Sequence, residues 1–143
     1  MESLRRIMLE EHERLHLLLD NFEKTLKNNA FLAGKKLDVF KWNLEKHFFL
    51  EERAVFVAYS NKSENEKTEI DKLIKEHINI LSLLSDLEKE FLLGRKPDFS
   101  ELNEMMRLHS KFENELFYPK LEKELDDEQK ESMILKSLKI IGG

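Results

Sequence analysis

The sequence predicts an all-α protein, and three observations support this. Apolar residues recur every three to four positions through four long segments, which is the spacing of a helix with one buried face. The chain has only four glycines and two prolines, so few residues interrupt helices. Charged residues make up 37% of the chain, with both signs mixed along the helix faces. We therefore expect an up-down-up-down four-helix bundle with a short fifth helix at the C-terminus.

Turn residues separate the segments that carry the helical pattern. The predicted helices cover, in order, about 3–27, 36–59, 65–93, 100–118 and 127–141. Asn28 and Asn29 are expected to end the first helix, and Gly34 to mark the turn after it. Residues 60–63, with the sequence SNKS, are expected to break the pattern after the second helix.

The fourth and fifth helices have distinct start and stop signals. Ser100 is expected to cap the fourth helix, because a serine side chain can accept a hydrogen bond from the first turn. Pro119 lacks an amide hydrogen, so the helix is expected to kink or restart after Tyr118. The last helix carries apolar residues that must dock on the bundle or on another subunit: Met133, Ile134, Leu135, Leu138 and Ile141.

Length and composition bound the class of protein. A chain of 143 residues predicts one domain over 1–143, with the bundle at about 3–125 and the last helix at about 127–141. No run of about 18 apolar residues and no export signal is recognisable, so we expect a cytoplasmic protein without a membrane partner. The absence of cysteine excludes disulfides, thiolate metal sites and iron–sulfur clusters. A net charge of −5 argues against a nucleic-acid partner, and the last helix is a candidate contact for a homo-oligomer.

Polar residues occupy the predicted buried face at two equivalent places. In the segment 40–58, His47 and Glu51 lie where core apolar residues are expected, and His109 and Glu113 repeat this spacing in the fourth helix. An uncompensated carboxylate in a helical core costs several kcal/mol. Two such carboxylates, each one turn after a histidine, therefore call for a cation.

An internal repeat relates the two halves of the chain. EEHERLHLLLDNFEK in the first helix parallels KEHINILSLLSDLEK in the third, and HFFLEE parallels HSKFEN. At about 1.5 Å per residue, six side chains fall at one depth of the bundle. The predicted metal ligands are His12, His47, Glu51, His77, His109 and Glu113. Their pseudo-twofold arrangement suits two metals that share two bridging carboxylates.

The ligand types limit the metal. Imidazoles and carboxylates suit iron or manganese and do not exclude zinc. If both glutamates bridge, each metal has two histidines and two carboxylate oxygens. An oxo or hydroxo bridge would bring it to five ligands and leave a position open for a diatomic molecule. His16 lies one turn after His12, and three roles stay open for it: a further ligand, a residue of the ligand pocket, or a hydrogen-bonded core histidine.

The order H, HxxxE, H, HxxxE resembles the hemerythrin-like (HHE cation-binding) family, from about Ile7 to Tyr118. The resemblance implies a four-helix bundle with a non-haem di-iron centre. That family includes oxygen carriers, sensors of oxygen or iron, and iron-centre repair proteins linked to nitric oxide. Respiratory hemerythrins have a second histidine where this chain has Leu73, and a bridging aspartate where it has Asn114. Glu113 is therefore expected to bridge instead.

Neighbouring residues have expected supporting roles. Glu52 is expected to contact a ligand from outside the site or to face solvent. Phe48 and Phe112 are placed to keep the site dry, and Tyr59 and Tyr118 are candidate donors to a bound ligand.

The resulting prediction is a di-iron protein that binds oxygen or nitric oxide for sensing, storage or scavenging. It is expected to bind a ligand rather than to act as an enzyme, with oxidase-type chemistry left open. One alternative is a metal-free helical adaptor that uses its C-terminal helix as a contact. Another is a zinc peptidase, because HERLH from His12 to His16 matches HExxH, although Glu13 is expected to face away from the buried stripe. Ferritin-like oxidases use ExxH, whereas this chain has HxxxE.

Overall fold

The computed structural model describes residues 3–59 and 63–142, and these residues form helices and loops with no β-strand. The all-α prediction is therefore confirmed for this part of the chain. The elements are α1 (Leu4–Leu26), α2 (Ala30–Leu50), η1 (Glu51–Phe56), α3 (Val57–Tyr59), α4 (Glu64–Leu92), α5 (Ser100–Phe112), η2 (Glu113–Phe117), α6 (Tyr118–Glu124) and α7 (Asp127–Gly142). The elements η1 and η2 are π-helical, and each continues the α-helix before it.

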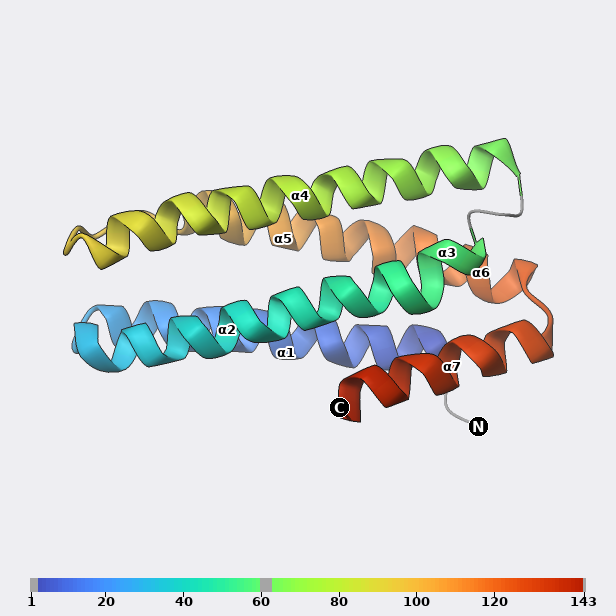
Figure 1. Cartoon of the computed structure of the whole chain (residues 1–143), viewed down its shortest axis with the longest axis horizontal. Coiled ribbons are helices and arrows are strands. Elements are labelled where there is room, and N and C mark those ends of the chain that lie inside the picture. Colours follow the sequence, from blue (N-terminus) through green and yellow to red (C-terminus); the bar gives the residue numbers. More distant parts are fainter. Residues whose placement is uncertain (1–2, 60–62, 143) are drawn as a thin grey trace.

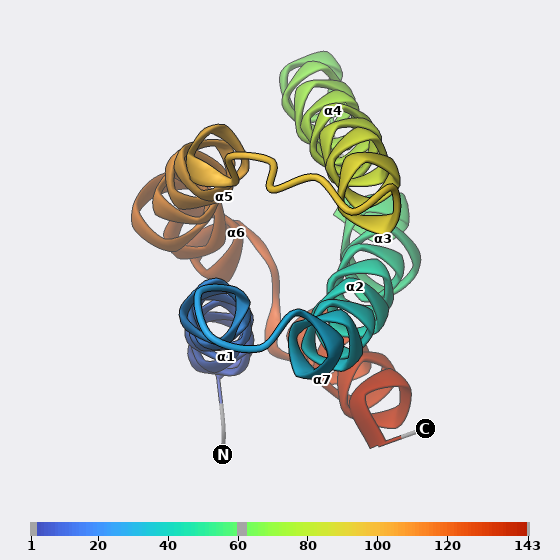
Figure 2. The same ribbon diagram turned by 90° about the vertical axis from the view of Figure 1, so that its left-hand side faces the viewer.

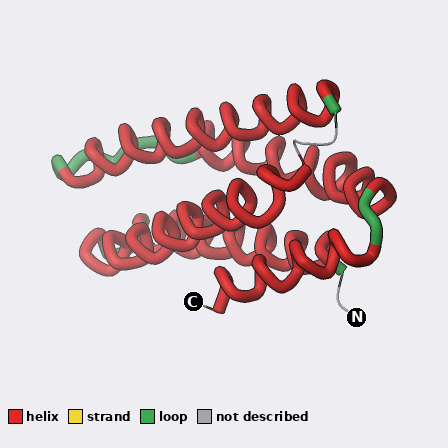
Figure 3. The backbone as a smooth tube through the Cα atoms, turned by 45° about the vertical axis from the view of Figure 1, so that its right-hand side comes forward, coloured by secondary structure: helices red, strands yellow, loops and turns green. Residues whose placement is uncertain are grey.

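The four long helical segments lie side by side along the long axis of the molecule (Figure 1). Viewed along that axis, α1, α2, α4 and α5 surround a common centre, and α7 lies outside them next to α2 (Figure 2). Helices make up most of the backbone, and the loops that join them are short (Figure 3). None of the helices within residues 3–59 and 63–142 is both long and apolar enough to cross a membrane.

The apolar interior consists of two clusters with a polar layer between them. One cluster lies near the start of α1 and includes Leu4 and Met8, and the other includes Leu15 and Leu19 further along the same helix. His12 lies between them in the sequence and is also buried. The same alternation occurs in the other long helices, where each buried histidine stands between buried apolar residues: His47 between Leu44 and Leu50, His77 between Leu73 and Ile80, and His109 between Met106 and Phe117.

The first helix begins as predicted, but the second begins earlier. The Ser3 hydroxyl caps α1 by accepting from the Arg6 amide at 3.1 Å. The Asn29 side chain caps α2 by accepting from the Leu32 amide at 3.0 Å, so α2 starts at Ala30 rather than near residue 36. Gly34 lies inside α2, and the prediction that it marks the turn was wrong. A single glycine costs a helix only about 1 kcal/mol, which the asparagine cap and the buried face of α2 outweigh.

The second and third connections also differ in detail from the prediction. Residues 60–62 of the predicted break lie outside the described residues, and Ser63 is the N-cap residue of α4. Gly94 follows α4 with a φ of 82°, a conformation that favours glycine. Ser100 is not the cap of α5, because Phe99 occupies the N-cap position. The Asp98 carboxylate instead accepts from the Ser100 amide at 2.9 Å.

Pro119 is accommodated without a break in the helix. The backbone passes from α5 into the π-helical η2, and α6 starts at Tyr118 with Pro119 in its first turn. A proline is tolerated in a first turn because its missing amide hydrogen is not needed there. A kink or restart after Tyr118 was expected, and the helix instead continues through Tyr118 and Pro119, with its change from π- to α-helical hydrogen bonding at Tyr118. The other π-helical segment, η1, contains no proline and was not predicted. Both begin at the glutamate of an HxxxE motif.

The C-terminal helix docks on its own chain. Met133, Ile134 and Ser137 of α7 are buried, and α7 packs against α2 and η1. The Lys46 ammonium also donates to the carbonyl of Ile141 at 2.7 Å. Of the apolar residues predicted to dock, Leu135 and Leu138 instead remain exposed, because Leu135 lies on the opposite face of α7 and Leu138 at the edge of the buried face. A homo-oligomer through this helix stays a prediction.

Candidate metal centre

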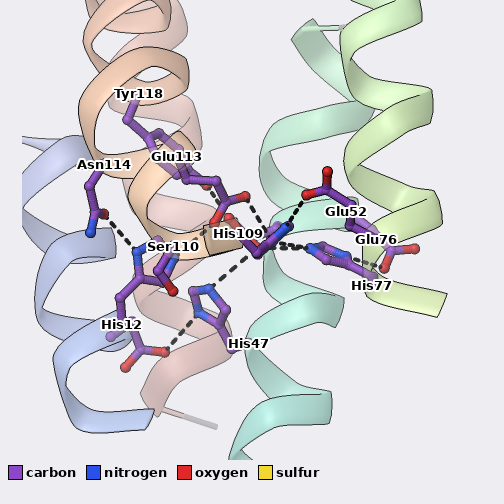
Figure 4. A network of polar contacts seen from close by, with 12 residues as sticks. His12, His47, Glu52, Glu76, His77, His109, Ser110, Glu113, Asn114 and Tyr118 are labelled. Atoms are coloured by element: carbon purple, nitrogen blue, oxygen red, sulfur yellow. Dashed lines mark hydrogen bonds and ion pairs between the residues drawn. The ribbon is translucent and has the colours of Figure 1, made fainter. Parts of the chain in front are cut away.

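Six polar side chains meet in the layer between the two apolar clusters (Figure 4). They are His12 of α1, His47 of α2, Glu51 at the start of η1, His77 of α4, His109 of α5 and Glu113 at the start of η2. Each has at most 6% of its surface exposed. The structure thus brings together all six residues that the sequence singled out. Their role as metal ligands stays a prediction.

The six side chains form two groups that share both glutamates. One group consists of His12, His47, Glu51 and Glu113, and the other of Glu51, His77, His109 and Glu113. Within each group, one candidate ligand atom from every residue lies within 4.8 Å of the others. Two adjacent cation positions that share two carboxylates fit this arrangement.

The two glutamates offer their oxygens differently. Glu113 directs Oε1 toward His12 Nε2 at 2.9 Å and Oε2 toward His109 Nε2 at 3.5 Å, so it presents one oxygen to each position. Glu51 directs a single oxygen, Oε1, toward both His47 Nε2 at 3.3 Å and His77 Nε2 at 3.2 Å. Its other oxygen accepts a hydrogen bond from the Tyr118 hydroxyl at 2.7 Å.

The outer partners of the histidines fix where their protons lie. Three histidines direct Nδ1 to an oxygen: His12 to Asn114 Oδ1 at 2.7 Å, His77 to Glu52 Oε2 at 3.0 Å, and His109 to Glu76 Oε1 at 2.7 Å. Amide and carboxylate oxygens only accept, so each Nδ1 must carry a hydrogen and donate it. In a neutral imidazole, the opposite Nε2 then holds a lone pair. All three Nε2 atoms point to the centre of the site.

The inward-facing atoms are therefore acceptors that face one another. His12 Nε2 faces the Glu113 carboxylate, and the Nε2 atoms of His77 and His109 lie 3.2 Å apart. Within the described part of the chain, no residue donates a hydrogen bond to His12 Nε2 or to either oxygen of Glu113. Buried acceptors at these distances repel unless a proton or a metal ion lies between them. The nitrogen and oxygen donors fit iron, manganese or zinc.

Without a metal ion, protons must take its place, and the pKa values shift accordingly. Burial opposes charge on His47, but Glu51 and Glu11 outweigh it and raise the pKa of His47 to about 9. Burial, helped by the His47 charge, lowers the pKa of His12 to about 3. Burial raises the pKa of Glu113 well above its ordinary value, and the Glu51 charge adds to this. Burial acts the same way on Glu51, but His47 outweighs it and holds the pKa of Glu51 well below the ordinary value.

Aromatic side chains close one side of the centre. The Phe48 ring stacks on the His77 ring, with 3.8 Å between their centroids, and Phe56 lies on the same histidine at 5.6 Å. Both phenylalanines are buried, whereas Phe112 is only partly buried. Tyr59 does not reach the centre, because its hydroxyl donates to Glu124 at 2.7 Å.

His16 lies outside both four-residue groups. Its Nε2 atom is 3.3 Å from the Ser110 hydroxyl, and its side chain is partly exposed. Glu13 is exposed, so it does not face His12 as the glutamate of a zinc peptidase would face the metal. The geometry therefore gives no support to the peptidase alternative.

A cavity between α4 and α5 lies beside the centre. It has a volume of about 310 Å³ and is lined by apolar residues together with Lys72, Glu76, Asn79 and His109. His109 belongs to the second four-residue group, so the cavity borders one of the candidate ligands.

The family comparison agrees with this geometry. Residues 3–121 match the sequence model of a family described as the hemerythrin HHE cation binding domain. The chain belongs to this family. No curated protein and no solved structure gives a match. The matched range contains all six clustered residues and ends before α7, so the part of the chain that matches the family includes the whole buried centre. The resemblance predicted from the order of histidines and glutamates is confirmed, and the chain is a cation-binding domain.

The sequence did not identify every residue that supports the histidines. Glu52 was expected either to contact a ligand from outside or to face solvent, and it accepts from His77. Glu11 and Glu76 were not predicted. A signal was available, because each is the glutamate directly before a histidine in the internal repeat. Each faces a histidine of a neighbouring helix: Glu11 lies 3.6 Å from His47, and Glu76 lies 2.7 Å from His109.

Proposed function

We propose that this hemerythrin HHE domain holds two iron ions and binds a small diatomic ligand, oxygen or nitric oxide. The proposed unit is one cytoplasmic domain over residues 1–143 with an up-down-up-down four-helix bundle. Zinc or manganese suits the same donor atoms and is the alternative occupant. The proposed roles are oxygen or nitric oxide sensing, storage or scavenging.

The proposed ligands follow from the two four-residue groups. His12 and His47 would hold one ion, and His77 and His109 the other, while Glu51 and Glu113 would contribute to both. A bound pair of irons supplies redox-active metal with a coordination position that a diatomic molecule can occupy. The residues of the chain hold the histidine rings in orientation and keep bulk water out of the layer.

One observation carries the proposal. Three buried imidazole nitrogens with their lone pairs inward lie around two buried carboxylates, and burial of these groups without compensation would cost several kcal/mol. A metal-free helical adaptor would gain nothing from retaining such a layer. Two divalent cations compensate both carboxylates and satisfy the nitrogens at once.

The surroundings support a small ligand rather than a large one. Phe48 and Phe56 cover the centre at His77, so a large substrate has no access there. The cavity beside His109 gives a diatomic molecule a route between α4 and α5. A sensing role is supported by the packing of α7 on η1, because η1 begins at Glu51 and a displacement of that residue would reach the C-terminal helix.

Metal analysis combined with optical spectroscopy tests the proposal. Protein purified without chelator is expected to contain two irons per chain, and its spectrum should change on anaerobic reduction and again on exposure to oxygen or nitric oxide. The variant Glu113→Gln should lose most of the metal, whereas the control Glu115→Gln, at an exposed position of η2, should retain it. Fewer than about one metal per two chains in the unaltered protein would contradict the proposal.

A further inference from the structure

The internal repeat extends to the residues that support the histidines. Glu11 precedes His12 and faces His47, and in the second half Glu76 precedes His77 and faces His109. The residue after each shared glutamate is also used. Glu52 follows Glu51 and accepts from His77, and Asn114 follows Glu113 and accepts from His12. Four equivalent places thus carry three carboxylates and one amide.

Asn114, the single amide among these four residues, makes the two halves of the centre unequal. One half contains His77 and His109, and the other contains His12 and His47. In one half, His77 and His109 both donate Nδ1–H to carboxylates, at 3.0 and 2.7 Å (Figure 4). In the other half, His12 donates to the neutral amide of Asn114 at 2.7 Å.

His47, the remaining histidine, adds to the difference between the two halves. His47 Nδ1 lies 3.6 Å from the Glu11 carboxylate, which is beyond hydrogen-bond distance. One half therefore has two charged hydrogen-bond acceptors behind its histidines, and the other has one neutral acceptor and one more distant charge.

A carboxylate behind a histidine strengthens that histidine as a metal ligand. It draws the Nδ1 proton outward, which leaves more electron density on Nε2, and it adds a negative charge near the cation. Loss of such an outer partner typically costs 10- to 100-fold in metal affinity. Glu52 and Glu76 have 40% and 33% of their side chains exposed, so solvent screens part of their charge but does not replace the hydrogen bonds. The shared glutamates serve both halves.

We propose that the two cation positions differ in affinity and fill in a fixed order. The position between His77 and His109 takes the first divalent cation and holds it tightly. The position between His12 and His47 fills second and exchanges more readily, and Asn114 is the positioning residue that sets it apart. This inference rests on the two-metal site proposed above and specifies how that site loads.

Anaerobic titration of the metal-free protein with Co²⁺, in competition with a chromophoric chelator, tests the order. The unaltered protein should show two binding steps whose affinities differ by about 10-fold or more. His12→Ala should abolish the weaker step and retain the tighter one, and His77→Ala should do the reverse. The cobalt absorption bands report each step separately from any activity.

Two isosteric variants test the supporting residues without disturbing the packing. Glu52→Gln should weaken the tighter step by about 10-fold, and Asn114→Asp should strengthen the weaker step by a similar factor. Glu115→Gln, which changes an exposed carboxylate of η2, should leave both steps unchanged. Circular dichroism of each metal-free variant confirms that the helices are retained.

The outcomes separate this inference from the proposed function. Two cobalt ions bound with equal affinity would overturn the inference and leave the two-metal site intact. A Glu52→Gln variant that weakens the step which His12→Ala abolishes would also overturn it. Failure of the unaltered protein to bind two ions at any concentration would instead remove the proposed function itself.

Discussion

Glu113 is expected to destabilise the metal-free protein, and Glu113→Gln tests this. The Glu113 side chain is fully buried, and no described residue donates a hydrogen bond to either oxygen. A glutamine amide would donate to the His12 Nε2 lone pair, which lies 2.9 Å from the carboxylate. Removing an uncompensated buried carboxylate should raise the free energy of unfolding by about 2 kcal/mol. For a chain of this size, that raises the melting temperature by about 6 °C.

The pH dependence of this effect has a definite sign. The pKa of Glu113 is raised in the folded protein, first by burial and then by Glu51. A group with a raised pKa stabilises the fold below its unfolded-state pKa, and this contribution is lost as pH rises toward the folded-state value. The gain in the free energy of unfolding that Glu113→Gln gives the metal-free protein should therefore be small near pH 4.5 and grow as pH rises to 8.

Urea unfolding of chelator-treated protein, followed by circular dichroism at pH 5 and pH 8, measures the effect. Glu115→Gln is the control, because Glu115 lies on η2 but is exposed. With metal added, the unaltered protein should become more stable than the Glu113→Gln variant, since the unaltered protein gains stability from metal binding and the variant does not. A metal-free variant that is less stable than the unaltered protein, or a difference in stability that is independent of pH, would contradict a destabilising role for Glu113.

Three further changes have expected outcomes. Tyr118→Phe removes a hydrogen bond to the buried, ionised Glu51 and should lower the free energy of unfolding of the metal-free protein by about 1.5 to 3 kcal/mol in urea titrations. Leu108→Trp should fill the cavity beside His109 and slow diatomic binding about 10-fold in stopped-flow measurements, without changing the metal content. Acidification should release the metal, because protons compete for the imidazole nitrogens, and dialysis at decreasing pH followed by metal analysis should show the loss below about pH 5.

Matched controls and contradicting results accompany these three changes. Tyr59→Phe removes a hydrogen bond to Glu124, which is exposed and can bind water instead, so this control should lower the free energy of unfolding less. Equal losses of stability in the two tyrosine variants would count against the role of Tyr118. Leu116→Trp at an exposed position of η2 should not slow ligand binding, and an unaltered rate in Leu108→Trp would exclude the cavity as the route. Full metal retention at pH 4 would argue against histidine ligation.

The periodicity of the sequence was sufficient to predict which polar residues lie inside. His47 and Glu51 are four residues apart on an apolar stripe, and one face of a helix repeats at that spacing whatever its neighbours are. The structure places both side chains in the interior, together with His109 and Glu113. The spacing of residues along one helix is enough for this prediction, because helix geometry alone determines which residues share a face.

Features that depend on packing between helices could not be read from the pattern. The π segment η1 begins at Glu51 without a proline or glycine to mark it, so its register is a result of tertiary placement. The early start of α2 depended on the Asn29 side chain acting as a cap rather than as a turn residue. The contacts of Glu11 and Glu76 also join different helices, and single-helix periodicity does not specify which helices are neighbours.

The proposed function requires two cations between Glu51 and Glu113. Anomalous diffraction at the iron absorption edge, from crystals of protein loaded anaerobically with iron, tests this most directly. Two anomalous peaks are expected, one bounded by His12 and His47 and the other by His77 and His109, with both glutamates in contact with iron. A map without peaks between the two carboxylates, or with iron held at the surface of the molecule, would contradict the proposed function.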